Sequence, residues 1–265
     1  MQHPAPTNTF VFKEVDGLEI NADIFLPTTP SRAPLPILVW FHGGGLLMSA
    51  RSNIGVHLRR AASKYNIAVV CPDYRLAPQA PITDIVEDVK DAIAWSRLKL
   101  PKLVGNVKLD SDRFIVGGHS AGTDGRIITH EEMACHVDPE APVRSYSVPA
   151  SFPPPPGDRG LLYLYMVQEA IFEKLLFGKV PKVNMDDFIP AKFWSKDMPP
   201  TYVFHGQIDN RVGIEQSHSL VEAFKAVGAT YEYEECPAPG GQHLFDHFDA
   251  SVELESMYSF IMKYF

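Results

Sequence analysis

The segment 118–122, of sequence GHSAG, surrounds a serine with the small residues that a nucleophile elbow requires. It directly follows the strand-like run 113–117. Small neighbours permit the sharp, strained turn from strand to helix that pushes a serine hydroxyl out of a sheet. We therefore predict that Ser120 is a nucleophile at the end of a buried strand.

A serine hydroxyl needs a base to take its proton and an acid to orient that base. Asp209 follows the apolar run 201–204 in a glycine-containing loop, and His243 lies in a loop after the strand-like run 231–235. Together with Ser120, they have the chain order nucleophile, acid, base. We predict that these three residues form a catalytic triad. The acidic residues that compete with Asp209, but lack its place directly after an apolar strand, are Glu215, Asp246 and Asp249.

An oxyanion in the transition state needs preorganised donors, and backbone N–H groups beside glycines supply them. The segment 42–45, of sequence HGGG, comes directly after the apolar run 36–41. We predict that Gly43 and Gly44 donate from this loop and Ala121 donates from the elbow. His42 is expected to brace the loop by hydrogen bonding and not to act as the catalytic base.

Together with the segment 73–78, of sequence DYRLAP, these motifs resemble the hormone-sensitive-lipase-type branch of the α/β-hydrolases. The similarity covers roughly residues 10–125 and 198–265. The resemblance implies hydrolysis of a small carboxylic ester through an acyl-enzyme, with no cofactor and no metal. It also implies that Asp73 and Arg75 are scaffold residues supporting the oxyanion loop, as are His42 and Gly45.

The pattern of strands and helices predicts an α/β fold with a mostly parallel central sheet flanked by helices. Alternating runs at 10–15 and 18–25 predict an antiparallel hairpin at the edge of that sheet. Continuous apolar runs such as 36–41 and 67–71 are typical of strands buried on both faces. Helices are expected at 54–64, 83–98, 214–227 and 246–264. We expect one domain over 1–265, with a proline-rich lid inserted at about 149–199.

Two segments depart from the family pattern. The stretch 123–132 after the elbow is more polar than usual, and 143–148 is a poor strand. Three alternatives therefore stay open: an amidase or deformylase with the same residues, a biosynthetic lyase, dehydratase or cyclase that uses His243 as a base, and a small-molecule receptor. The presence of His243 and the short stretch before the first strand argue against the receptor.

The composition of the chain argues against some classes of binding partner. The formal net charge is −8 with no basic block, which argues against nucleic acid. No run approaches the ~18 apolar residues of a membrane-spanning helix, and no leader is recognised, so we expect a cytoplasmic protein. Three scattered cysteines indicate reduced thiols. The expected partner is a small-molecule ester, and a homodimer is left open.

Overall fold

The computed structural model describes residues 4–29, 32–119, 130–141, 156–179, 184–188, 190–237 and 240–264. The chain divides into two compact units, 1–179 and Val180–Tyr264. The single domain expected over 1–265 stays a prediction. The helix expected at 123–132, the strand expected at 143–148 and the start of the lid fall largely outside the described residues.

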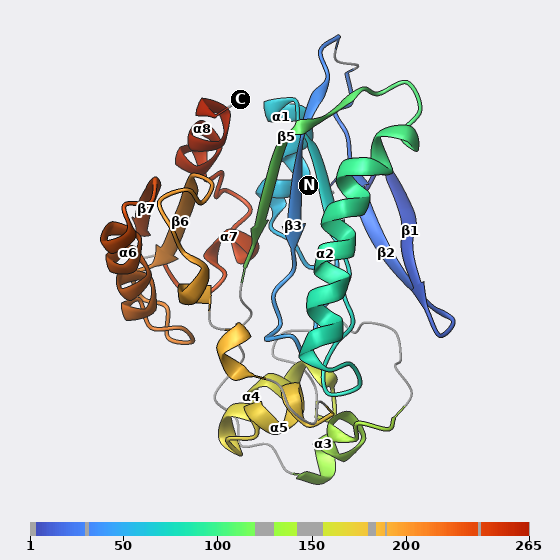
Figure 1. Ribbon diagram of the computed structural model, residues 1–265, viewed down its shortest axis with the longest axis vertical. Helices are drawn as coiled ribbons and strands as arrows, with labels where there is room; N and C mark the ends of the chain where they lie inside the picture. Colours follow the sequence, from blue (N-terminus) through green and yellow to red (C-terminus); the bar gives the residue numbers. More distant parts are fainter. Residues whose placement is uncertain are drawn as a thin grey trace. The chain divides into compact units, whose positions relative to one another are not determined.

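The first unit is built on a five-stranded sheet with the strand order β1-β2-β4-β3-β5 (Figure 1). The strands β3, β4 and β5 are parallel, whereas β1 and β2 form an antiparallel hairpin whose second strand pairs with β4. The expected parallel sheet with an antiparallel edge is confirmed. The bounds are Asn8–Val15 for β1, Leu18–Phe25 for β2, Leu35–Phe41 for β3, Ala68–Pro72 for β4 and Leu109–Gly118 for β5.

Helices cover both faces of this sheet (Figure 1). On one face, α2 (Ile82–Leu98) packs Trp95 against Val39 and Val70. Successive strand residues point to opposite faces, so Trp40 points the other way and lies edge-on to His57 of α1 (Val56–Tyr65). Burial on both faces explains why β3 and β4 are continuous apolar runs.

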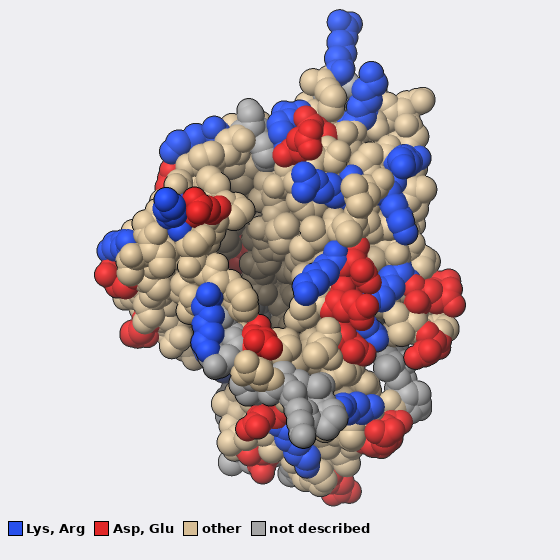
Figure 2. Space-filling model, viewed as in Figure 1, with Lys and Arg blue, Asp and Glu red and all other residues tan. Residues whose placement is uncertain are grey.

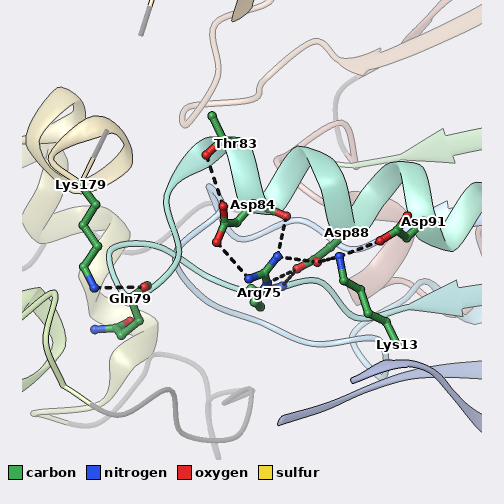
Figure 3. Close-up of polar contacts among 8 residues, drawn as sticks. All are labelled: Lys13, Arg75, Gln79, Thr83, Asp84, Asp88, Asp91 and Lys179. Atoms are coloured by element: carbon green, nitrogen blue, oxygen red, sulfur yellow. Dashed lines mark hydrogen bonds and ion pairs between the residues drawn. The ribbon is translucent and has the colours of Figure 1, made fainter. Parts of the chain in front are cut away.

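Polar groups also tie α2 to the sheet (Figure 3). Asp88 is fully buried on α2 and forms ion pairs with Arg75, at 2.8 Å, and with Lys13 of β1, also at 2.8 Å. Asp84 and Asp91 extend the same network at its two ends. Figure 2 shows acidic side chains gathered over this helix. A buried carboxylate next to two cations fixes how α2 sits on β1 and on the loop after β4.

The lid region of the first unit consists of short helices. The apolar stretch 161–177 forms two helices, α4 (Leu162–Gln168) and α5 (Phe172–Phe177). They are separated at Ala170, whose φ is 53°. The 3-10 turn η2 (Arg159–Leu161) leads into α4, and α3 (His130–Val137) packs beside both. The segments η3 (Met185–Phe188) and η4 (Pro190–Phe193) belong to the second unit.

The second unit contains a parallel pair of strands, β6 (Thr201–Gly206) and β7 (Tyr231–Cys236). The helix α6 (Glu215–Val227) connects them, as the sequence predicted. Two loops at the same end of this pair carry the predicted acid and base. The unit therefore holds two of the three predicted triad residues on one strand–helix–strand element.

The prediction of one helix over 246–264 is wrong. The chain forms α7 (Phe245–Phe248) and α8 (Glu255–Lys263), with a break between them. At the break, Oδ1 of Asp249 accepts hydrogen bonds from the backbone N–H and the hydroxyl of Ser251. Such a local side-chain turn competes with the helical hydrogen bonds of the backbone. None of the helices in the described part of the chain is long and apolar enough to cross a membrane.

Candidate active site

The loop after β6 presents Asp209. Oδ1 of this carboxylate accepts the backbone N–H groups of Arg211, at 2.8 Å, and Val212, at 2.9 Å. The same loop is tied to the loop of the predicted base, because Ile208 N–H donates to the carbonyl of Gly241 at 3.0 Å. These backbone contacts leave Oδ2 of Asp209 as the oxygen that can engage another side chain.

His243 engages that oxygen. Its Nδ1 lies 2.7 Å from Oδ2 of Asp209, and the exposed fractions of the two side chains are only 10% and 7%. A carboxylate oxygen can only accept, so the proton is on Nδ1 and the lone pair is on Nε2. Nε2 has no hydrogen-bond partner among the residues described. An imidazole held in this tautomer can take a proton at Nε2.

The environment keeps Asp209 charged. Burial by itself raises the pKa of this carboxyl, but the hydrogen bonds from Val212, Arg211 and His243 outweigh burial and hold the pKa below its ordinary value. An ionised Asp209 stabilises the imidazolium that forms when His243 accepts a proton.

His205 is a second histidine at this carboxylate, and the sequence analysis gave it no role of its own. Its Nε2 donates to the carbonyl of Val212 at 2.9 Å and lies 3.4 Å from Oδ2 of Asp209. The hydroxyl of Ser217 lies 2.6 Å from Nδ1 and donates to it. The ring therefore holds together the loop that carries Asp209. The signal in the sequence was its place four residues before Asp209, at the end of an apolar strand.

In the first unit, the segment 42–45 follows β3 and is held by contacts of His42. Nδ1 of His42 donates to the carbonyl of Gly43 at 2.7 Å, and the His42 ring stacks on Tyr74 with 4.2 Å between ring centroids. Burial lowers the pKa of His42 to about 4. A neutral, buried ring that donates its Nδ1–H to a backbone carbonyl acts as a structural brace.

These contacts fix the directions of the backbone N–H groups in the loop. In a trans peptide, the N–H of one residue points opposite to the carbonyl of the residue before it. The Tyr74 hydroxyl donates to the His42 carbonyl at 2.7 Å, and the N–H of Gly43 points the other way, toward Nε2 of His119 at 3.1 Å. Gly43, a predicted oxyanion donor, thus directs its amide at an imidazole.

His119 receives a second donor. The indole N–H of Trp40 lies 2.8 Å from Nδ1 of His119. A neutral imidazole has one acceptor nitrogen, so it accepts from Trp40 or from Gly43 at any moment. Trp40 makes the shorter contact. Both N–H groups are nevertheless directed at the ring of His119, the residue that precedes the predicted nucleophile.

The next two amides of the loop are unengaged within the described residues. Gly44 N–H lies opposite the Gly43 carbonyl held by His42, and Gly45 N–H lies opposite the Gly44 carbonyl, which accepts from Leu47 at 3.0 Å and Met48 at 3.2 Å. Only glycine suits these positions. The φ values are 119° at Gly44 and 59° at Gly45, and a Cβ would meet the Met48 backbone and the Tyr163 ring respectively.

Asp73 and Arg75, which the resemblance assigned to the scaffold, are both held by ion pairs. Asp73 is fully buried and accepts from the backbone N–H of Arg51 at 2.7 Å and from its guanidinium at 2.6 Å. Burial raises the pKa of Asp73 in spite of Arg51. Arg75 donates its Nε to Asp88 and its Nη1 to Asp84. These ion pairs hold the segment that carries Tyr74, whose hydroxyl contacts the loop 42–45.

Ser120 and Ala121, the predicted nucleophile and elbow donor, lie outside the described residues. Their part in the site, and the assembly of the whole triad, therefore stay predictions. No group of three or more His, Cys, Asp or Glu side chains that could hold a metal ion occurs within the described ranges.

Comparisons with known proteins support the same fold that the structure shows. A family model described as alpha/beta hydrolase fold matches residues 38–143. The chain is 31% identical to the non-reducing polyketide synthase ascC of Acremonium egyptiacum and 25% identical to the non-reducing polyketide synthase pkbA of Emericella nidulans. Each alignment covers 90% of this chain, but this chain spans only 14% and 13% of those proteins.

Solved structures agree. Esterase 2 of Thermogutta terrifontis, phosphonylated by sarin, has a TM-score of 0.63 and 19% identity, covering 99% of this chain and 94% of that one. The propionate-bound form of the esterase has a TM-score of 0.62 and 22% identity, with 99% and 93% covered. At these identities the likeness shows a shared fold.

Proposed function

This chain has the α/β-hydrolase fold and resembles its hormone-sensitive-lipase-type branch, and we propose that it is a serine hydrolase cleaving a carboxylic ester of a small molecule through an acyl-enzyme. The observation that carries this proposal is the contact between Asp209 and His243. It sets the tautomer of the imidazole and leaves Nε2 as a base without a partner among the described residues. That arrangement is what a serine nucleophile needs.

The proposed reaction has two halves. Nε2 of His243 takes the hydroxyl proton of Ser120 while the serine oxygen attacks the ester carbonyl. The resulting imidazolium is stabilised by Asp209 and then gives its proton to the departing alcohol, leaving an acyl-serine. Water attacks the acyl group with His243 again as base, and the acid leaves as the serine regains its proton.

The oxyanion needs N–H groups that are not engaged elsewhere. We assign this role to Gly44 and to Ala121, as the sequence suggested, and add Gly45. The amides of Gly44 and Gly45 are unengaged within the described loop, whereas the amide of Gly43 faces His119. Donation from Gly43 would require that amide to turn away from the ring.

The relatives favour a particular acyl group. Two polyketide synthases match nearly all of this chain, and a polyketide is itself an acyl chain. We propose that the acyl half of the substrate is a polyketide-derived acid, presented as an oxygen ester or as a thioester. An amide substrate would use the same residues and differ only in the leaving group.

Active-site labelling tests the nucleophile. A fluorophosphonate should form one adduct, mapped by mass spectrometry to Ser120, and Ser120→Ala should abolish both the adduct and turnover. Rates should then be compared for matched p-nitrophenyl esters, thioesters and amides of aliphatic and aromatic acids. Turnover retained in Ser120→Ala would reject the acyl-enzyme and favour the lyase or cyclase alternative with His243 as base.

A further inference from the structure

The lid region directs one guanidinium at two loops of the first unit. Arg159, in η2, donates through Nε to the carbonyl of Leu47 at 2.7 Å. Through Nη2 it donates to the carbonyl of Ala77 at 2.6 Å and to Oε1 of Gln79 at 2.8 Å. The loops that carry these acceptors lie 80 to 112 residues away in the chain, so Arg159 joins the lid region to two distant loops.

None of these three acceptors is a carboxylate. Burial lowers the pKa of Arg159 to about 10, and the side chain is therefore still a cation at neutral pH. No ion pair with Arg159 occurs among the described residues. Partial burial of such a cation costs stability, whereas its charge-assisted hydrogen bonds hold their acceptors in fixed directions. The residue is therefore better suited to holding loop carbonyls in place than to strengthening the fold.

Leu47 belongs to the turn that shapes the oxyanion loop. Its own N–H donates to the carbonyl of Gly44 at 3.0 Å, and its carbonyl is held by Arg159. Because the carbonyl of Gly44 and the N–H of Gly45 belong to one planar peptide, the turn sets the direction of the Gly45 amide. Arg159 acts on that direction through Leu47.

The same guanidinium closes a bridge between two loops. The N–H of Ala77 donates to the carbonyl of Leu46 at 2.9 Å, and Arg159 spans the neighbouring carbonyls of Leu47 and Ala77. The loop 77–79 is also held to the lid region from its other side, since Nε2 of Gln79 donates to the carbonyl of His136 at 3.2 Å. The oxyanion loop, the loop after β4 and the lid region thus form one connected structure.

A second lid residue touches the same glycine loop. Tyr163 lies four residues after Arg159, a spacing that places side chains on the same side of a helical segment. Its ring packs directly on Gly45, where a Cβ would lie 2.7 Å from ring carbon Cε2. Arg159 therefore holds this loop through its hydrogen bond to the Leu47 carbonyl, and Tyr163 holds it by packing on Gly45.

We propose that Arg159 is a positioning residue, which couples the lid region to the oxyanion loop by holding the carbonyl of Leu47. The proposal rests on the proposed function for its effect on rate. Its structural content, the ordering of the turn 44–48 by Arg159, can be tested without any turnover.

The test compares Arg159→Met and Arg159→Lys with the wild type and with Lys179→Met. Lys179 is a matched control, since it is another lid cation and contacts the carbonyl of Gln79 at 3.5 Å. Among the described residues it makes no hydrogen bond to the glycines 43–45. We expect Arg159→Met to lower kcat roughly 10- to 100-fold with a much smaller change in KM, because a misplaced donor costs rate. Arg159→Lys should regain folding stability but little kcat, because one ammonium does not reproduce the guanidinium fork that spans Leu47 and Ala77.

Amide hydrogen exchange provides a measurement that does not depend on activity. The amides of Leu47 and Met48 should exchange faster in Arg159→Met and Arg159→Lys than in Lys179→Met or the wild type. Wild-type kcat and wild-type exchange in Arg159→Lys would overturn the proposal, even where Arg159→Met fails to fold. A wild-type protein without esterase activity, but with the expected exchange pattern, would instead reject the proposed function and leave the positioning role standing.

Discussion

The ring of Tyr163 occupies the space that a side chain at Gly45 would need. We therefore expect Gly45→Ala to destabilise the protein by about 1–3 kcal/mol, through overpacking and the positive φ of 59°. Turnover should fall at least tenfold, since the loop must shift.

A double-mutant cycle separates the two causes. In a Tyr163→Ala background, the steric part of the Gly45→Ala penalty should disappear and only the backbone strain should remain. Denaturant unfolding of the four proteins measures this coupling. Equal penalties in both backgrounds would show that Tyr163 does not limit residue 45.

Asp209 is expected to act through His243. Asp209→Asn should lower kcat by about 10⁴-fold while the protein stays folded, because an amide in place of the carboxylate favours the wrong imidazole tautomer. Asp249→Asn is the control, since Asp249 was a competing candidate whose carboxylate accepts hydrogen bonds from Ser251, two residues away. A loss in Asp249→Asn that matches the loss in Asp209→Asn would refute the assignment.

The lowered pKa of Asp209 also predicts a pH dependence of stability. Its folded-state pKa lies below the ordinary value of 3.8, so the ionised carboxylate contributes stability above that value. This contribution is lost as the pH falls through the folded-state pKa. The difference in unfolding free energy between wild type and Asp209→Asn should shrink as the pH falls below about 4. A difference that grows on acidification has the wrong sign for this explanation.

The buried network under α2 is expected to contribute to stability. Removing one partner of a buried ion pair leaves an uncompensated charge, at a cost of about 3–5 kcal/mol. We expect Asp88→Ala to show a loss of this size in chemical denaturation, because the Asp88 side chain is fully buried beside Arg75 and Lys13. Lys225→Met breaks an exposed pair with Glu222 and should change stability by less than about 1 kcal/mol. Similar losses in the two variants would argue against a special role of the buried pair.

Local patterns in the sequence determined most of the fold. The alternating runs around Asp16 and Gly17 predicted the hairpin, and the continuous apolar runs predicted the parallel strands β3 and β4. These predictions succeed because the spacing of apolar residues within a single segment reflects whether one or both faces of its strand are buried. The prediction of one helix over 246–264 failed because hydrophobic periodicity does not register the side-chain turn made by Asp249.

The pairing of Asp209 with His243 was also foreseen, since chain order and position after strands select those two residues. Which backbone amides of the glycine loop are engaged could only be decided by the tertiary structure. The orientation of each peptide depends on Tyr74, His119 and Arg159, which approach the loop from distant parts of the chain. A motif specifies that glycines are present, but hydrogen bonds from outside the motif decide where their N–H groups point.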